Sequence, residues 1–216
     1  MSNEMLLLLA ESLLETIYMV GVSSFIATLV GLPLGIILVT TARGHILENI
    51  ALNRTLGAIA NAARSTPFII LMVAIIPLTR LLAGTSIGTN AAIVPLSLAA
   101  IPFVARIIES ALQEVDRGVI EAAQAMGASP TQIIIKVLVP EALPAIILGL
   151  TLTIINLIGH SAMAGAIGGG GLGDLAIRYG YQRFRADVML ITVIILIAQV
   201  QIVQSCGDAL AKKFRK

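Results

Sequence analysis

Long apolar runs separated by short polar connections dominate this chain. The first run, Ile17–Ala42, and the last, Val188–Gly207, contain no charged residue. A helix needs about 20 mostly apolar residues to cross the hydrocarbon core of a bilayer. Both runs therefore predict membrane-spanning helices.

Three further spans are predicted between these two. The second is Pro67–Leu78, with Ser65 or Thr66 as its cap and the proline in its first turn. The third is about Ala91–Val104, and the fourth is about Leu143–Ile167. The sequence thus predicts an all-α integral membrane fold with five transmembrane helices, in which residues 1–216 form a single domain.

Two details of these spans follow from local sequence. The segment Arg43–Asn61 is predicted to be a short polar connection outside the hydrocarbon. The third span is expected to extend toward Glu109 and to be bent or interrupted at Pro95 and Pro102, because proline removes a helical hydrogen bond.

A polar segment between the third and fourth runs is ordered. Its glycine at position 127 can take a positive φ and end a helix, and Ser129 with Pro130 can start the next. Gly118 is a candidate interruption of the upstream helix. Apolar residues at three- and four-residue steps are expected on one face of that helix; they are Ile108, Ala111, Leu112, Val115, Val119, Ala122 and Met126.

The spacing within this segment matches a known motif. Glu-Ala-Ala at 121–123 is separated by three residues from Gly127. Nine further residues separate Gly127 from Val137, which is followed by Val139 and Pro140. It resembles the cytoplasmic helix-turn-helix loop of ATP-binding-cassette (ABC) importer permeases, where Ile and Leu are usual at the two valine positions. An ordinary surface helix is the alternative. The resemblance implies that the residues coupling this chain to an ATPase are Glu121, Ala122, Ala123, Gly127, Ser129 and Pro130.

Two other stretches extend the resemblance over nearly the whole chain. Arg64-Ser65-Thr66-Pro67 opens the second predicted span, and Ser161–Gly165 leads into Gly-Gly-Leu-Gly. Together with the five spans, these are similar to the permease family of bacterial methionine importers. Without the resemblance, Arg64 is explained as an arginine at the membrane interface whose charge reaches water.

This family implies a function and a set of partners. The substrate is L-methionine, with D-methionine as a further candidate. The partners are a second copy of the chain, two cytoplasmic ATPase subunits that bind ATP and Mg, and an extracytoplasmic substrate-binding protein, in the inner membrane of a bacterial cell. No cofactor is expected in this chain.

Polar residues inside the fourth predicted span need partners, because hydrocarbon offers none. Asn156, Ser161 and Met163 are therefore candidates to line the substrate path. For Asn156 and Ser161, hydrogen bonding between helices is an equal alternative. For His160, a satisfied interior histidine is the favoured explanation.

The distribution of basic residues predicts the orientation of the chain. With the N-terminus outside, four basic residues are external, namely Arg80, Arg178, Arg183 and Arg185. Ten are cytoplasmic, as the positive-inside rule requires; they are Arg43, Arg54, Arg64, Arg106, Arg117, Lys136, Lys212, Lys213, Arg215 and Lys216.

Several function classes are disfavoured by the composition. The chain is 57% hydrophobic and only 12% charged, with a net charge of +2, so nucleic acid is an unexpected partner. It contains no G-x-x-x-x-G-K-[ST] phosphate loop. His45 and His160 lie on different predicted elements, so neither a metal site nor a catalytic site is predicted. The chain is not expected to be an enzyme.

Three alternatives remain open. A secondary transporter would need repeat-related halves and often intramembrane acidic residues, whereas no Asp or Glu lies inside a clear predicted span. A channel or structural subunit would not explain the ordered polar segment. A permease for another amino acid or an osmolyte would share all of these features.

Overall fold

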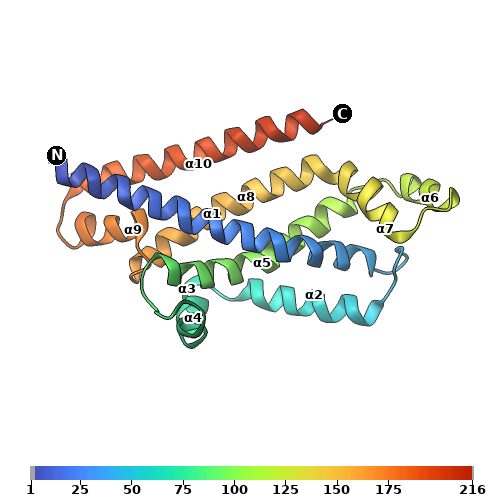
Figure 1. The fold of residues 1–216 in the computed structure, drawn as a ribbon, viewed down its shortest axis with the longest axis horizontal. Coiled ribbons are helices and arrows are strands. Elements are labelled where there is room, and N and C mark those ends of the chain that lie inside the picture. The colour runs from blue at the N-terminus through green and yellow to red at the C-terminus, as the bar shows by residue number, and fades with distance from the viewer. Residues whose placement is uncertain (1–2, 216) are drawn as a thin grey trace.

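The computed structural model describes residues 3–215, which are helical with connecting turns and contain no strand (Figure 1). The initial Met1 and Ser2 and the final Lys216 lie outside the described residues. The helices, including two π-helical segments η1 and η2, are α1 (Asn3–Thr40), α2 (Ile50–Ser65), α3 (Phe68–Ala74), α4 (Ile76–Ala83), α5 (Thr89–Gln113), α6 (Arg117–Ala125), α7 (Pro130–Ile133), η1 (Ile134–Leu138), α8 (Val139–Ala166), α9 (Gly171–Leu175), η2 (Ala176–Tyr181) and α10 (Ala186–Phe214).

Within residues 3–215, four helices are long and apolar enough to cross a membrane, namely α1, α5, α10 and the continuous run Pro130–Ala166. A fifth span is obtained if α2 and α3, which meet at an angle of 100°, are counted together. The all-helical fold with four to five spans is confirmed.

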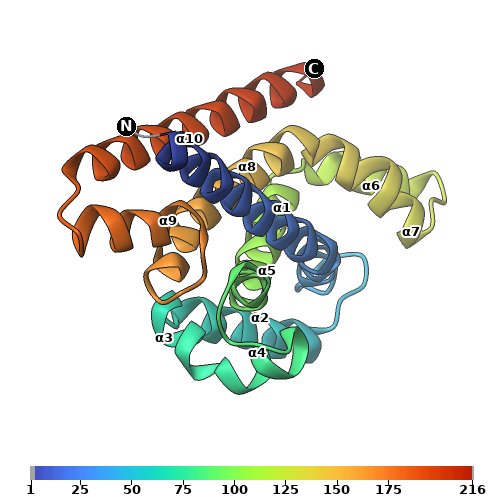
Figure 2. The same cartoon turned by 60° about the vertical axis from the view of Figure 1, so that its left-hand side comes forward.

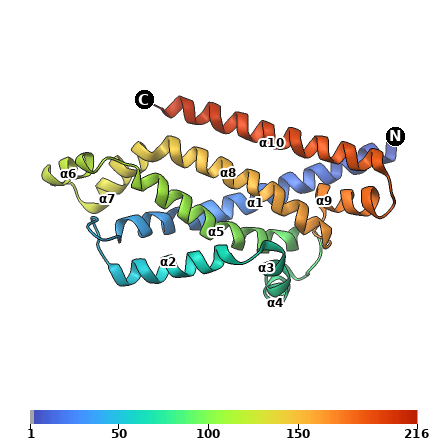
Figure 3. The same cartoon turned by 180° about the vertical axis from the view of Figure 1, so that it is seen from behind.

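The position of the second span was wrong. The predicted polar connection Arg43–Asn61 is a short turn followed by α2, whose first turn is capped by Asn49 because its side chain accepts a hydrogen bond from the backbone N–H of Leu52 at 3.1 Å. The predicted span Pro67–Leu78 is divided between α3 and α4 (Figure 3).

Neither predicted cap of the second span acts as one. The hydroxyls of Ser65 and Thr66 donate backwards to the carbonyls of Asn61 and Ala62, at 2.8 and 3.3 Å. Pro67 then takes an extended conformation, with φ −57° and ψ 132°, and α3 begins after it without a side-chain cap. The break between α2 and α3 therefore lies inside the candidate span Ile50–Ala74, whereas the sequence predicted that the span starts there.

Helices α1 and α5 pack together along the middle of the molecule, with α10 on one side and α2 to α4 on the other (Figure 2). Glycines permit the close approach. A Cβ atom at Gly31 would lie 2.7 Å from the Cβ of Val104, and one at Gly35 would lie 2.6 Å from that of Ile108. α5 runs past Glu109 as predicted, and Pro95 and Pro102 do not interrupt it.

The two ends of the molecule are built differently. α6 and α7 lie together at one end, and the N-terminus and α9 lie at the other (Figure 1). At the α9 end, the carboxylate of Glu15 accepts from the backbone N–H of Gly171 at 2.6 Å, and the hydroxyl of Thr16 accepts from that of Leu172 at 2.9 Å. The backbone N–H of Gly88 also donates to the carbonyl of Gly168 at 2.8 Å. The glycine-rich stretch Gly168–Gly171 thus forms a packed junction between α1, α5 and α8.

Candidate coupling element and transport cleft

The helix leading into the polar segment is interrupted earlier than the sequence indicated. α5 ends at Gln113, and α6 begins at Arg117 after Asp116, whose carboxylate accepts from the backbone N–H of Gly118 at 2.6 Å. An aspartate cap satisfies an otherwise unpaired N–H of the new helix. Gly118 therefore lies in the first turn of α6, and the break precedes it.

This restart changes which face of the helix is buried. Ile120 and Ala123 are the buried residues of α6, whereas Val119 is 44% exposed and Met126 is 82% exposed. The prediction that Val119 and Met126 continue the apolar face of Ile108 was wrong, because a helix that begins again at a new cap does not keep the phase of the previous one. Ala122 is exposed for the same reason.

The turn between α6 and α7 has the predicted geometry. Gly127 has a φ of +78°, a region that costs glycine little, and it follows Met126, the C-cap of α6. Ser129 and Gln132 form a reciprocal capping box: the Ser129 hydroxyl accepts from the backbone N–H of Gln132, and the side-chain amide oxygen of Gln132 accepts from the backbone N–H of Ser129 at 2.9 Å. Pro130 occupies the first turn of α7.

A small cleft of about 120 Å³ lies between α6 and the turn that follows α1. Glu121 and Gln124 of α6 line it together with His45, and Arg117 is at its edge. Burial, and then the charge of Arg117, lower the pKa of His45 below its ordinary value. Glu121 is exposed and forms no ion pair with any residue in the range 3–215. This end of the molecule thus presents an unpaired carboxylate.

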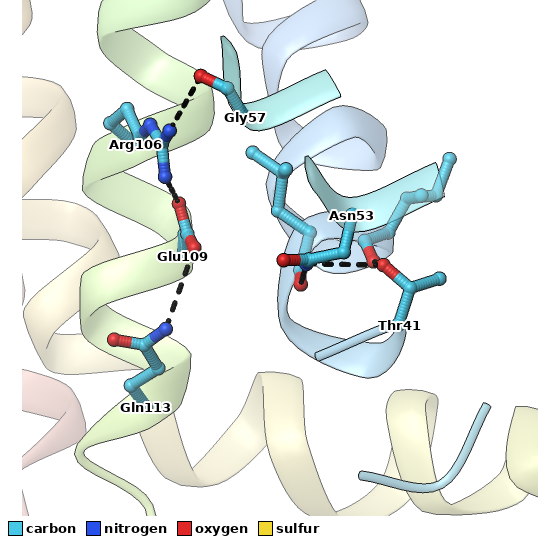
Figure 4. A network of polar contacts seen from close by, with 8 residues as sticks. Thr41, Asn53, Gly57, Arg106, Glu109 and Gln113 are labelled. Atoms are coloured by element: carbon cyan, nitrogen blue, oxygen red, sulfur yellow. Dashed lines mark hydrogen bonds and ion pairs between the residues drawn. The ribbon is translucent and has the colours of Figure 1, made fainter. Parts of the chain in front are cut away.

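A polar network near the same end joins α2 to its neighbours (Figure 4). The Arg106 guanidinium pairs with Glu109 at 2.6 Å and donates to the Gly57 carbonyl of α2 at 2.8 Å. The Asn53 amide donates to the Leu38 carbonyl at 2.5 Å and to the Thr41 hydroxyl at 3.3 Å. Sequence reasoning treated Arg106 only as a cytoplasmic charge, since no local pattern reveals a partner 49 residues away.

A second, larger cleft of about 340 Å³ lies between α5, α8 and the break that joins α2 to α3. It is lined by Ala63, Arg64, Thr66, Pro67, Phe68, Ala99, Ala100, Phe103, Thr153, Asn156, Leu157 and His160. His160 stacks on Phe68, with ring centroids 4.4 Å apart and ring planes 6° from parallel. This contact agrees with an interior histidine that holds two helices together.

The three candidate path residues of α8 do not lie together. Asn156 lines the larger cleft. Ser161 is buried, and its hydroxyl donates to the Ile158 carbonyl of its own helix at 2.7 Å, which neither expected alternative included. Met163 is 49% exposed and is not among the residues of this cleft. Of the three, Asn156 alone is brought to the cleft by the structure, and the roles of all three remain predictions.

Within the described part of the chain, no group of three or more His, Cys, Asp or Glu residues could hold a metal ion. Among these residues, Asp174 pairs with Arg178 and Asp187 pairs with Arg185.

Residues 31–216 match the family model described as "Binding-protein-dependent transport system inner membrane component". The chain belongs to this family. Members are membrane components of importers, so the chain is a multi-pass permease subunit, and the secondary-transporter and channel alternatives no longer apply.

Two relatives match most of this chain in sequence. The probable D-methionine transport system permease protein MetI of Vibrio cholerae is 57% identical over 206 residues, covering 95% of this chain and 92% of the relative. The D-methionine transport system permease protein MetI of Escherichia coli K12 is 52% identical over 165 residues, covering 76% of each.

Two solved structures resemble the fold of this chain. A chain of the MetNI methionine ABC transporter in inward-facing conformations is 48% identical, with a TM-score of 0.98 and complete coverage of both chains. A chain of an amino acid ABC transporter solved with histidines has a TM-score of 0.79 at 20% identity, covering 97% of this permease and 95% of that chain. At that identity the second likeness concerns the fold alone.

Proposed function

We propose that this chain is the permease subunit of an ATP-driven methionine importer and that residues 1–216 form one permease domain. The supporting observation is its 48% identity and 0.98 TM-score, over both full chains, to a protein described as part of a methionine ABC transporter. The relatives named for D-methionine make both enantiomers candidate substrates. ATP and Mg are bound, and ATP is hydrolysed, by a separate ATPase subunit.

The proposed assembly contains two copies of this permease, two ATPase subunits and an extracytoplasmic binding protein. A symmetric pair is physically reasonable because a single chain only partly encloses the larger cleft, and a second copy can complete the enclosure. The proposed location is the bacterial inner membrane, with the N-terminus outside and the α6–α7 end in the cytoplasm. Arg54 and Arg64 both lie within the second candidate span, Arg54 near its start and Arg64 beside its break. Without these two, eight of the ten basic residues predicted to be cytoplasmic still face four predicted to be external.

The proposed coupling mechanism follows from chain connectivity. α6 follows α5 after a turn, and α7 continues through η1 into α8 without a break. α5 and α8 carry two walls of the larger cleft. A rigid displacement of α6 and α7 by the ATPase subunits would therefore move the walls of the cleft directly. ATP binding favours the outward-open state and hydrolysis returns the inward-open state, because the ATPase binds the two conformations with different affinity.

Glu121, Ala122, Ala123, Gly127, Ser129 and Pro130 are the proposed ATPase-coupling residues. Glu121 supplies an exposed carboxylate for a basic group of the ATPase, and the other members set the direction in which α6 and α7 project. Asn156, Ser161 and Met163 are retained as candidate path residues, with Asn156 in the cleft and the other two outside it.

Uptake in cells tests this function. Cells that lack the permease should lose ATP-dependent, high-affinity uptake of labelled methionine, and a plasmid copy of the chain should restore it. Methionine uptake that persists while uptake of another amino acid or an osmolyte is lost would reject the substrate and keep the importer class.

A further inference from the structure

The larger cleft contains an arginine whose charge is not paired with any carboxylate of residues 3–215. Arg64 lies in the last turn of α2, two residues before the 100° break to α3, and so lies inside a candidate membrane span. In the figures this break lies between the two ends of the molecule (Figures 1 and 3). The prediction that Arg64 stands at the start of a helix was wrong, because it lies in the last turn of α2.

Position, together with the lack of an ion pair, distinguishes Arg64. Arg106, Arg178 and Arg185 each pair with a carboxylate close in sequence, whereas Arg64 has no carboxylate within 4.0 Å among residues 3–215. Other arginines in this range also lack an ion pair, but Arg64 is the arginine that lines the larger cleft. Its guanidinium carbon instead lies 5.8 Å from the ring centroid of Phe103 on α5, within the range of a cation–π contact. Charged residues inside membrane spans are costly and mark functional sites.

The opposite wall of the cleft adds further polar groups. The hydroxyl of Thr153 is occupied, since it donates to the Gly149 carbonyl at 3.0 Å, and the ring of His160 is stacked on Phe68. Asn156 is exposed, and its side-chain amide has no hydrogen bond to any residue in the range 3–215. Leu157 on this wall, and Ala99 and Ala100 on the α5 wall, are apolar.

These groups suit a particular class of ligand. A guanidinium binds a carboxylate through two parallel charge-assisted hydrogen bonds, an amide can donate or accept, and alanine and leucine side chains favour an apolar side chain. The volume of about 340 Å³ lies in the range of small-molecule sites. A zwitterionic amino acid with an apolar side chain has all the complementary groups.

We propose that Arg64 binds the α-carboxylate of the amino acid during its passage through the permease, and that Asn156 makes the second polar contact from α8. This proposal rests on the proposed import of an amino acid. Because α2, α5 and α8 all contribute to the cleft, the movement of α5 and α8 that accompanies coupling changes the distance between the two polar groups. The site thus binds the substrate in one state and releases it in another.

Photo-crosslinking of the purified permease–ATPase complex tests the proposal. The probe is a diazirine analogue of methionine, used without the binding protein and both with and without ATP. Methionine should compete with the probe at least about 10-fold better than methioninol, which lacks the carboxylate, since a charge-assisted hydrogen bond contributes a factor of that order. The labelled residues should be those of the larger cleft.

Variants separate recognition from folding. In Arg64→Gln the preference for methionine over methioninol should disappear, and Arg64→Lys should restore part of it because the charge is retained without the bidentate geometry. The matched control is Arg54→Gln, an exposed arginine of the same helix that is not part of the cleft. It should keep the full preference.

Two results would overturn the assignment. The first is equal competition by methionine and methioninol in the unmodified complex under both nucleotide conditions. The second is an Arg64→Gln complex that retains the preference. Either result, obtained with a permease that restores methionine uptake in cells, rejects the Arg64 site and leaves the proposed function standing. Normal methionine uptake in cells that lack the permease would instead reject the proposed function.

Discussion

At the scale of single residues, the coupling role rests on one exposed carboxylate and one glycine. Glu121 is exposed beside a small cleft and has no ion-pair partner in the range 3–215. Gly127 has a left-handed backbone conformation, and a Cβ atom there would meet nothing within 4 Å. In the proposed coupling role, Glu121 would therefore act through its charge and Gly127 through its backbone freedom.

Reversing the charge of Glu121 should uncouple the permease. Glu121→Lys is expected to leave the protein in the membrane and dimeric, to weaken ATPase association by about 2 kcal/mol or more, and to abolish uptake, because the ATPase group that faces Glu121 is left unpaired. Co-purification of the ATPase and uptake of labelled methionine measure this. Glu11→Lys, the same charge change on an exposed residue of α1, is the control and should have no effect. Normal ATPase binding by Glu121→Lys would contradict the coupling role.

Gly127 should tolerate only residues that accept a positive φ. Gly127→Val is expected to abolish transport and weaken ATPase binding while the protein stays inserted, because a β-branched residue is strained at a φ of +78° and α7 would be displaced. Gly127→Asn should retain much of the uptake, since asparagine adopts this conformation more readily. Equal uptake by the valine and asparagine variants would show that the backbone conformation does not matter.

At the scale of elements, the contact between α1 and α5 depends on the glycines of α1. A Cβ atom at Gly35 would lie 2.6 Å from both the Ala105 carbonyl oxygen and the Ile108 Cβ, so the helices would have to separate. In α5 itself, the residues facing α1 include Val104, which is fully buried. The close approach of these two helices therefore depends both on the glycines of α1 and on the side chains of α5 that pack against them.

Substitution at Gly35 should lower stability. Gly35→Leu is expected to reduce the free energy of unfolding by about 1–3 kcal/mol or more, the usual cost of overpacking a tight contact. Thermal unfolding of the purified complex, followed by size-exclusion chromatography, measures the change. Gly21→Ala is the control on the same helix, because a Cβ atom there has no neighbour within 4 Å. Equal melting temperatures for the two variants would show that the contact is looser than the structure indicates.

At the scale of the whole molecule, the orientation fixes which end meets the ATPase. If the broken pair α2 and α3 counts as one crossing, the four long helices and this pair give an odd number of crossings, and the two termini lie on opposite sides. The α6–α7 end and the N-terminus lie at opposite ends of the molecule (Figure 1). If the N-terminus is outside, α6 and α7 are exposed to the compartment that contains ATP.

Reporter fusions test this orientation. A reporter that is active only in the cytoplasm should be active after Lys216 and inactive before Met1, because basic residues are retained preferentially on the cytoplasmic side. A second fusion within the turn at Gly84, predicted to be external, should be inactive. Activity of the N-terminal fusion would place α6 and α7 outside and would contradict the coupling mechanism.

Most of the secondary structure and the coupling element could be predicted because their signals are local. A long uncharged run specifies a spanning helix by length and polarity alone, and Gly127, Ser129 and Pro130 specify a turn through their own backbone preferences. The errors arose where an alternative local cap competes with periodicity. Asp116 restarts a helix that the apolar pattern continued, and Asn49 starts a helix in a segment that looked like a polar connection.

The sequence by itself determined that this chain spans a membrane as helices and that it carries a helix-turn-helix with the coupling motif, because these depend on residues within a few turns of each other. Only the tertiary structure decided that Arg64 lies in a cleft with Asn156, that Ser161 bonds within its own helix, and that Arg106 reaches Gly57. Those contacts depend on the crossing of helices far apart in the chain. The break between α2 and α3 has a local cause, since Thr66 precedes Pro67 and is extended, but only the packing of α2, α5 and α8 brings Arg64 and Asn156 to one cleft.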